Sequence, residues 1–272
     1  MVSIAPSFVI NTSELANCLA RLRASTPLIQ CLTNTVVTNF TANVLLAAGA
    51  SPAMADLPGE AGDFATIASG TLINLGTPYA EQRNGFLEAV AAANSSRTPW
   101  VLDPVAIGSL KIRTELAFEL RSLDPTVIRG NASEIMVLAD SGSGGRGVDS
   151  TDTVTVAAQH ARDLALRSGA VVAVSGQEDL ITDGTRNVLV HGGSDMLTRV
   201  TGGGCALGAM VAAFLSVHDD PLVATVAAHA FYSAAAERAV LISDGPGSFA
   251  MNFIDSLHLV QPQELKDKAV LS

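Results

Sequence analysis

The sequence predicts an α/β protein in which a mostly parallel central sheet is flanked by helices. Short apolar runs typical of buried strands alternate with longer segments of helical spacing along most of the chain. The 272 residues are 48% hydrophobic and only 15% charged, which is enough apolar material for one large core. No long linker interrupts the alternation, so we expect residues 1–272 to form a single domain.

The first half of the chain predicts four strands with helices between them. Short apolar runs predict the strands at 28–32, 51–55, 71–75 and 100–105. Helical spacing predicts helices at 38–48, 60–68, 79–93 and 113–122. Gly49 ends the first of these helices and Gly76 follows the third strand, as expected of residues that interrupt regular structure.

The second half begins with the same alternation and then changes. Strands are predicted at 126–128 and 171–174, a helix at 152–166 and a surface loop at 141–145. After Gly176, two β-rich runs flank Asp183-Gly184 and predict a hairpin of 180–182 with 187–190. From Gly202 onward the chain is predicted to be nearly all helical.

Composition excludes several classes of function. The 16 Lys and Arg against 26 Asp and Glu give a net charge of −10, the wrong sign for general binding to nucleic acid or an anionic membrane surface. Apolar stretches such as 222–236 are too short and too interrupted to span a bilayer. The scarcity of charge suggests a surface buried in an oligomer.

Cysteine usage and the start of the chain bear on the compartment. Cys18, Cys31 and Cys205 are odd in number and lack the C-x-x-C spacing of a zinc or redox site. Residues 1–13 lack the basic and apolar regions of a signal peptide. We therefore expect the reducing cytoplasm.

The run Gly202-Gly203-Gly204-Cys205 is the most informative local feature. Glycines leave backbone amides uncovered, and the apolar residues after them predict a buried helix, whose N-terminus favours an anion. No Lys follows as in the nucleotide-binding P-loop, and the spacing does not fit G-x-G-x-x-G. Cys205, in the first helical turn, is a candidate reactive thiol of lowered pKa, with a small buried hydrophobe as the alternative.

Polar residues follow several of the predicted strands, where ligands of open α/β sheets bind. Arg129 is a candidate phosphate clamp, although an ordinary surface ion pair is the alternative. Asp103 and Glu134 are candidate Mg²⁺ ligands, although each taken singly suits a helix cap or a surface charge. The full set is Asn34, Asp103, Arg129, Asn131 and Ser175, which together suggest a phosphate-handling pocket.

An ordered set of motifs between about residues 27 and 215 resembles the hydroxyethylthiazole kinases, a thiamine-salvage family of the ribokinase-like superfamily. The motifs are Thr33-Asn34, Asn39, Ala42-Asn43, residues 45–54, Asn74-Leu75-Gly76-Thr77, Leu102-Asp103-Pro104-Val105, residues 129–135, Gly147-Val148-Asp149-Ser150, Ser175-Gly176, residues 179–184 and residues 201–205.

The resemblance implies a ribokinase-like fold and transfer of a phosphoryl group from ATP, with Mg²⁺, to the primary alcohol of 4-methyl-5-(2-hydroxyethyl)thiazole. It also implies a homotrimer with active sites between subunits. Cys205 would stand where related sugar kinases carry an aspartate base, with Gly203 and Gly204 as catalytic neighbours. The other implied residues are Met54, Asn34, Val36 and Gly202 for the thiazole, Arg129, Ser175 and Asn131 for ATP, and Asp103 and Glu134 for the metal.

Two positions depart from the family pattern. Gly203 replaces the second threonine of the usual T-G-T-G-C, and Ala106-Ile107 replace a usual Gly-Ala after Asp-Pro-Val. Two other functions stay open at this point. One is a related kinase acting on a hydroxymethylpyrimidine, and the other is a non-catalytic protein that binds the thiazole or a nucleotide.

Overall fold

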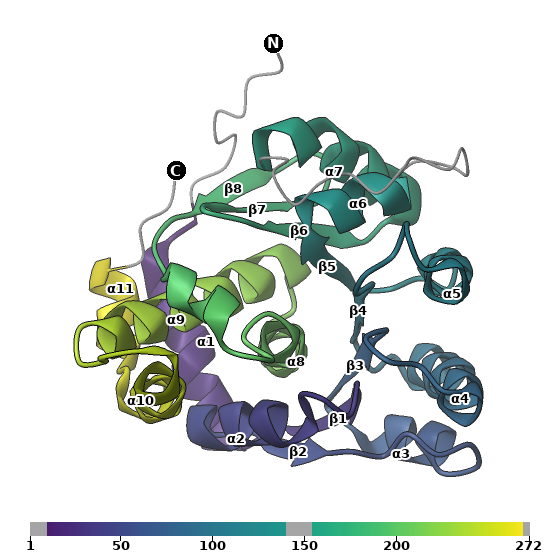
Figure 1. Cartoon of the computed structure of the whole chain (residues 1–272), viewed down its shortest axis with the longest axis horizontal. Helices are drawn as coiled ribbons and strands as arrows, with labels where there is room; N and C mark the ends of the chain where they lie inside the picture. The colour runs from purple at the N-terminus through teal and green to yellow at the C-terminus, as the bar shows by residue number, and fades with distance from the viewer. Residues whose placement is uncertain (1–9, 140–153, 269–272) are drawn as a thin grey trace.

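Eight strands form one continuous sheet in the computed structural model, which describes residues 10–139 and 154–268 (Figure 1). The spatial order is β2-β1-β3-β4-β5-β6-β7-β8. Strands β1 to β6 run parallel, whereas β7 and β8 are antiparallel additions at one end. The bounds are β1 (Leu28–Leu32), β2 (Ser51–Ala53), β3 (Gly70–Asn74), β4 (Trp100–Asp103), β5 (Val127–Asn131), β6 (Val171–Ser175), β7 (Asp179–Thr182) and β8 (Asn187–Val190).

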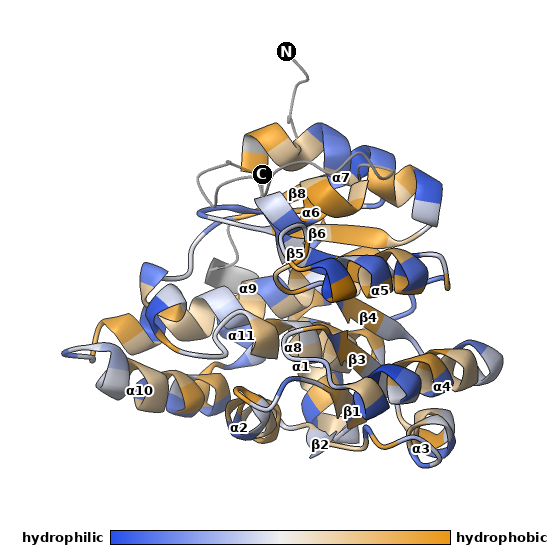
Figure 2. Ribbon diagram, turned by 45° about the vertical axis from the view of Figure 1, so that its right-hand side comes forward, coloured by the Kyte–Doolittle hydropathy of each residue, from blue (hydrophilic) through white to orange (hydrophobic). Residues whose placement is uncertain are grey.

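Helices cover both faces of the sheet, and each face has its own apolar core (Figures 1 and 2). One face carries α1 (Thr12–Ser25), α2 (Thr38–Ala48), α8 (Cys205–Leu215), α9 (Pro221–Val240), α10 (Pro246–Leu259) and α11 (Pro262–Lys268), with the 3₁₀ helix η1 (Asp195–Arg199) nearby. The other face carries α3 (Ala61–Ile67), α4 (Ala80–Ser96), α5 (Lys111–Arg121), α6 (Ala132–Ala139) and α7 (Val154–Ser168). The predicted mostly parallel α/β fold is confirmed.

The predicted strands and the hairpin are confirmed with small shifts at their ends. The run at 51–55 forms a strand only over Ser51–Ala53. Sequence reasoning missed α1, although its buried residues have helical spacing and Asn11 caps its first turn. It also missed the short α6. The predicted loop at 141–145 and the motif at 147–150 lie outside the described residues.

Helix α8 is buried after its first residue, and its position decides where the site lies. Every residue from Ala206 to Leu215 is buried, as expected of a helix that is apolar on all sides. Gly208 lets the helix approach the sheet, because a Cβ there would meet Leu72 and Asp103. The N-terminus of α8 therefore lies against the carboxyl end of β4.

Strand register brings polar side chains together at the same edge. Asn74 pairs with Asp103 at the ends of β3 and β4, and Asn131 pairs with Ser175 at the ends of β5 and β6. All four residues lie at the carboxyl edge of the parallel strands, which is where open α/β sheets bind their ligands.

Candidate active site

Arg129 joins two segments of the carboxyl edge that are far apart in sequence. Its Nη1 donates to the carbonyl of Gly204 at 2.9 Å, and its Nη2 donates to Ser175 Oγ at 2.8 Å. Nη1 also lies 3.7 Å from Asp103 Oδ2. The guanidinium is buried, and its Nε has no hydrogen-bond partner among the described residues. Arg129 is therefore a buried cation rather than part of a surface ion pair.

Asp103 is a buried carboxyl group with one oxygen to spare. Its Oδ2 accepts from Asn74 Nδ2 at 2.8 Å, whereas Oδ1 finds no partner within the described part of the chain. Burial raises the pKa of Asp103 to about 7, with a further rise from Glu134 and an opposing effect of Arg129 and Asn74. Because buried polar atoms are rarely left unpaired, Oδ1 is suited to accept a cation or a proton.

Asn74 organises the site, and sequence reasoning gave it no role. Its Nδ2 serves Asp103, while its Oδ1 accepts from Asn34 Nδ2 at 2.9 Å and from the Gly76 amide at 3.0 Å. Asn34 Nδ2 also lies 3.8 Å from Cys205 Sγ. One side chain thus fixes both Asp103 and Asn34. The signal in the sequence was an amide directly at the end of a buried strand.

The glycine run precedes α8 as predicted, but its three members differ. Gly202 has a φ of +93°, and a Cβ there would press against Val37 and Phe40, so glycine is needed. The Gly203 amide donates to the Val200 carbonyl at 3.1 Å. The expectation that the glycine run leaves its backbone amides free for an anion is therefore corrected at Gly203, because the Gly203 amide is already used in a turn.

The packing around Gly203 explains why it replaces the second threonine of the usual T-G-T-G-C. A Cβ at this position would run into the carbonyl oxygen of Leu197. A threonine there would require the backbone of η1 to move. Gly204 is different, because its nearest neighbours would be Arg129 Nη1 at 3.6 Å and Nη2 at 3.7 Å from the added carbon, which is ordinary contact.

The expected low pKa of the Cys205 thiol is wrong. Burial raises the pKa of Cys205 above its ordinary value, and the nearby Asp103 carboxylate raises it further, against smaller effects of Asn74, Arg129 and Asn34. The largest cause of the rise is partial burial of the side chain. Cys205 is therefore a neutral thiol at physiological pH, not a ready thiolate nucleophile.

Glu134 and Asn131 form a reciprocal cap at the start of α6. Glu134 Oε2 accepts from the Asn131 amide at 2.8 Å, and Asn131 Oδ1 accepts from the Glu134 amide at 2.9 Å. Glu134 Oε1 accepts from the Ala106 amide at 2.9 Å, in the loop after Asp103. The interpretation of Glu134 as a helix cap therefore holds, and Glu134 also anchors the loop that follows Asp103, the other candidate metal ligand.

Asn34, Val36 and Met54 lie in the two loops that follow the paired strands β1 and β2. Asn34 is buried, Met54 is half-buried against the core, and the Val36 side chain is 65% exposed. Gln82 ties the two loops together, because its Nε2 donates to Thr33 O at 2.9 Å and to Asp56 Oδ2 at 3.0 Å.

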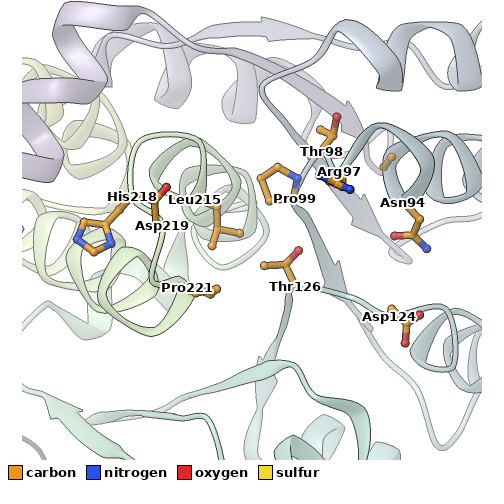
Figure 3. Close-up of a pocket in the computed structure, with 11 residues that line it drawn as sticks. Asn94, Arg97, Thr98, Pro99, Asp124, Thr126, Leu215, His218, Asp219 and Pro221 are labelled. Atoms are coloured by element: carbon orange, nitrogen blue, oxygen red, sulfur yellow. The ribbon is translucent and has the colours of Figure 1, made fainter.

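A surface cavity of about 470 Å³ lies away from this constellation (Figure 3). Its lining includes Pro99 and Thr126, which precede β4 and β5, and His218, which follows α8. It therefore opens at the amino ends of the strands. None of the predicted site residues lines it.

Comparison with known proteins agrees with this geometry. The model of the hydroxyethylthiazole kinase family matches residues 19–263. The chain is 58% identical to a hydroxyethylthiazole kinase of Clavibacter sepedonicus over 261 residues, covering 96% of this chain and 95% of that protein.

Solved structures extend the comparison to the fold. The structure of a hydroxyethylthiazole kinase protein from Pyrococcus horikoshii OT3 has 35% sequence identity and a TM-score of 0.88, covering 95% of this chain and 98% of that chain. A pyridoxal kinase from Staphylococcus aureus, in complex with AMP-PCP, has a TM-score of 0.59 at 17% identity over 78% of this chain and 88% of its own. The second likeness concerns the fold alone and agrees with the expected ribokinase-like architecture. By family model, sequence and structure together, the chain belongs to the hydroxyethylthiazole kinase family.

Proposed function

We propose that the protein transfers the γ-phosphoryl group of ATP to the primary hydroxyl of 4-methyl-5-(2-hydroxyethyl)thiazole. One observation carries the proposal: buried Arg129 links Ser175 to the Gly204 turn, directly beside buried Asp103 and half-buried Cys205. A fixed cation beside a helix N-terminus is suited to the charge of a triphosphate. Family membership supports the identity of the acceptor.

Phosphoryl transfer needs positioning and charge stabilisation more than a strong base. In our proposal the Gly204 and Cys205 amides face the migrating phosphoryl group, while Arg129 and Ser175 contact the rest of ATP. The Gly203 amide is left out because it donates to Val200. In this proposal the acceptor alcohol binds beside the neutral Cys205 thiol, and the contact of Asn34 Nδ2 with Cys205 Sγ at 3.8 Å supports the position of that side chain.

The donor set fits Mg²⁺, which proteins hold through one or two carboxylates together with phosphate oxygens and water. Asp103 Oδ1, which has no hydrogen-bond partner among residues 10–139 and 154–268, is the available acceptor. Both oxygens of Glu134 already accept backbone amides, so we assign Glu134 to a water-mediated role. Bound Mg²⁺ would offset the negative charge of the triphosphate. Asn131, whose side chain caps α6, would stand beside the nucleotide.

We further propose that Met54, Asn34, Val36 and Gly202 line the thiazole site, and that a homotrimer completes it. Val36 is 65% exposed, which leaves an open side for a neighbouring subunit to cover. Exposed apolar side chains on and before α10 support an interface, namely Leu241, Ile242 and Met251. Light scattering coupled to gel filtration tests the trimer, and a monomeric mass in active samples would refute it.

Residues 1–272 are proposed to act as one domain in the cytoplasm. The single continuous sheet supports one domain, and three free cysteines suit a reducing compartment. No helix in residues 10–139 or 154–268 combines the length and apolarity needed to cross a bilayer.

ADP release with Mg-ATP and each candidate alcohol tests the function. We expect turnover with the thiazole alcohol and little with the hydroxymethylpyrimidine. The reverse preference would favour the pyrimidine kinase. Nucleotide or thiazole binding without ADP release from any alcohol would favour a non-catalytic binding protein.

A further inference from the structure

Helix α9 carries polar side chains in a fully buried stretch, and the proposed reaction makes no use of them. His229 is 0% exposed and Tyr232 is 2% exposed. The two residues are three positions apart, so they project from the same side of the helix. Burying such groups is costly unless they are hydrogen-bonded. Their partners therefore show what the two side chains do.

Tyr232 holds the glycine turn in front of α8. Its hydroxyl donates to the Gly203 carbonyl at 2.8 Å. Burial raises the pKa of Tyr232, so the hydroxyl keeps its proton and remains a donor. The next residue, Gly204, accepts from Arg129 through its own carbonyl. Successive carbonyls of the turn are thus held by α9 on one side and by the Arg129 guanidinium on the other.

His229 holds the turn of residues 175–179, between β6 and β7, through Asp179. Its Nδ1 lies 2.7 Å from Asp179 Oδ2, and Asp179 Oδ1 accepts from the Gly176 amide at 3.0 Å. An ionised carboxylate only accepts, which assigns the ring proton to Nδ1. His229 Nε2 has no hydrogen-bond partner among the described residues, so the ring's one polar contact there is to Asp179. Gly176 directly follows Ser175, the other partner of Arg129.

The contacts close into a ring. Arg129 bonds to Gly204, and the neighbouring Gly203 bonds to Tyr232 on α9. One turn earlier on α9, His229 bonds to Asp179, which accepts from the Gly176 amide. Ser175, the neighbour of Gly176, bonds to Arg129 and completes the closed series of contacts. Figure 1 shows α9 beside α8 and next to the β6–β8 end of the sheet. One rigid helix therefore fixes the spacing between the two turns.

We propose that His229 and Tyr232 are positioning residues for nucleotide binding, acting from α9 on the two turns that Arg129 joins from β5. The inference rests on the proposed function in taking these turns as the ATP site. Neither residue touches the nucleotide. Losing one of the two should let its turn relax and weaken the binding of the triphosphate, while the thiazole loops after β1 and β2 keep their geometry.

The test uses Tyr232→Phe, which removes only the hydroxyl, and His229→Leu, which removes the donor to Asp179. His229→Asn is the conservative variant, because its amide can donate from about the position of Nδ1. Thr225→Val is the matched control on the same helix. Thr225 is equally buried, and its hydroxyl donates at 2.7 Å to Pro221 O, at the start of the same helix and in neither turn.

The readout is the Kd of a non-hydrolysable ATP analogue with Mg²⁺, measured by calorimetry on the full chain, together with the KM of each substrate. Tyr232→Phe and His229→Leu should each raise the Kd and the KM for ATP about three- to ten-fold, as expected for one lost hydrogen bond. The KM for the alcohol should change less than about two-fold. His229→Asn should restore most of the loss, and Thr225→Val should bind as the wild type does.

Wild-type affinity in the Tyr232→Phe variant would overturn the proposal, as would an equal loss in Thr225→Val. If His229→Leu does not fold by circular dichroism, Tyr232→Phe still decides. Analogue binding needs no acceptor alcohol. Lack of turnover with the thiazole alcohol in a wild-type protein that binds the analogue would therefore refute the proposed function and leave this test intact.

Discussion

Arg129 and Gly204, separated by 75 positions in the sequence, are joined by a hydrogen bond of 2.9 Å from the guanidinium to the backbone carbonyl. The guanidinium lies in ordinary contact distance of the place where a Cβ on Gly204 would stand. A branched side chain there would push its methyl groups against Arg129 and over the amides at the start of α8.

We therefore expect Gly204→Val to lower kcat/KM for ATP by roughly 100-fold or more, since preorganised donors of this kind contribute that much. Steady-state ADP release measures the loss, with Gly204→Ala as the milder control. Near-normal turnover of the valine variant would remove the anion-binding assignment from this turn.

Cys205→Asp should remain active, because its carboxylate can accept the proton of the alcohol. Cys205→Ser should be slower by roughly ten- to a hundred-fold but still measurable, since the loose transition state does not demand a strong base. Both variants would be compared with the wild type in the ADP assay. Complete inactivity of the two folded variants would instead indicate obligatory thiol chemistry.

The raised pKa of Cys205 predicts slow alkylation at neutral pH. The rate of reaction with iodoacetamide should rise with pH and reach its midpoint above that of a free cysteine, because only the thiolate reacts. Asp103→Asn should move this midpoint down, since it removes a negative neighbour. Peptide mapping separates Cys205 from the more deeply buried Cys18 and Cys31, whose pKa values burial raises to about 11 and about 12. A midpoint near that of a free thiol would contradict the prediction of a raised pKa.

Asp103→Asn should abolish most of the turnover, because it removes the charge and the free acceptor assigned to Mg²⁺. In the metal-free protein, by contrast, ionisation of Asp103 should lower the free energy of unfolding. The folded carboxyl, with its pKa of about 7, holds its proton more tightly than the unfolded chain does. The Asp103 contribution to the unfolding free energy therefore falls as pH rises from about 4 to about 7.

Urea unfolding across this pH range, with metal chelated, measures the effect. The wild-type curve should decline more steeply with pH than that of Asp103→Asn. Parallel curves would show that Asp103 keeps an ordinary pKa in the folded protein.

Gly203→Ala should destabilise the fold by roughly 1–3 kcal/mol, because the added carbon meets the Leu197 carbonyl and the backbone must shift. Gly204→Ala is the matched control, since its Cβ has room. Thermal denaturation should show a clear drop in Tm for Gly203→Ala and little for Gly204→Ala. Equal stability of the two variants would mean that the backbone of η1 can shift at little cost in free energy.

The sequence predicted the sheet, the hairpin and the glycine-led helix because each has a local signal. Buried strands are continuous apolar runs, and three glycines before an apolar helix are hard to misread. The same signals placed Asp103, Asn131 and Ser175 at one edge, because parallel strands end on the same side, whereas Arg129 lies two residues before the end of β5. Helix α1 was missed because its few buried residues are spread among polar ones, which gives a weaker signal than a continuous apolar run.

Side-chain geometry is beyond the reach of such local signals. Nothing in the glycine run distinguishes Gly203, whose amide is used and whose Cα faces Leu197, from Gly204, which faces Arg129. The pKa of Cys205 is raised by partial burial and by Asp103, which lies 102 positions earlier in the sequence, so the helix terminus alone predicted the wrong direction. Asn74 gains its role only through Asp103 and Asn34, which other strands bring to it.

The reversed direction of β7 has a consequence for how the site is supplied with residues. Each parallel strand ends at the carboxyl edge of the sheet, so its last residue and the start of the next loop lie there. Strand β7 instead begins at that edge, so its first residue, Asp179, arrives there. The bend at Asp183 and Gly184 is carried to the far edge, and β8 returns the chain at Val190. Lengthening that bend should therefore leave the carboxyl edge undisturbed, whereas inserting a single residue between Ser175 and Asp179 should displace side chains at that edge.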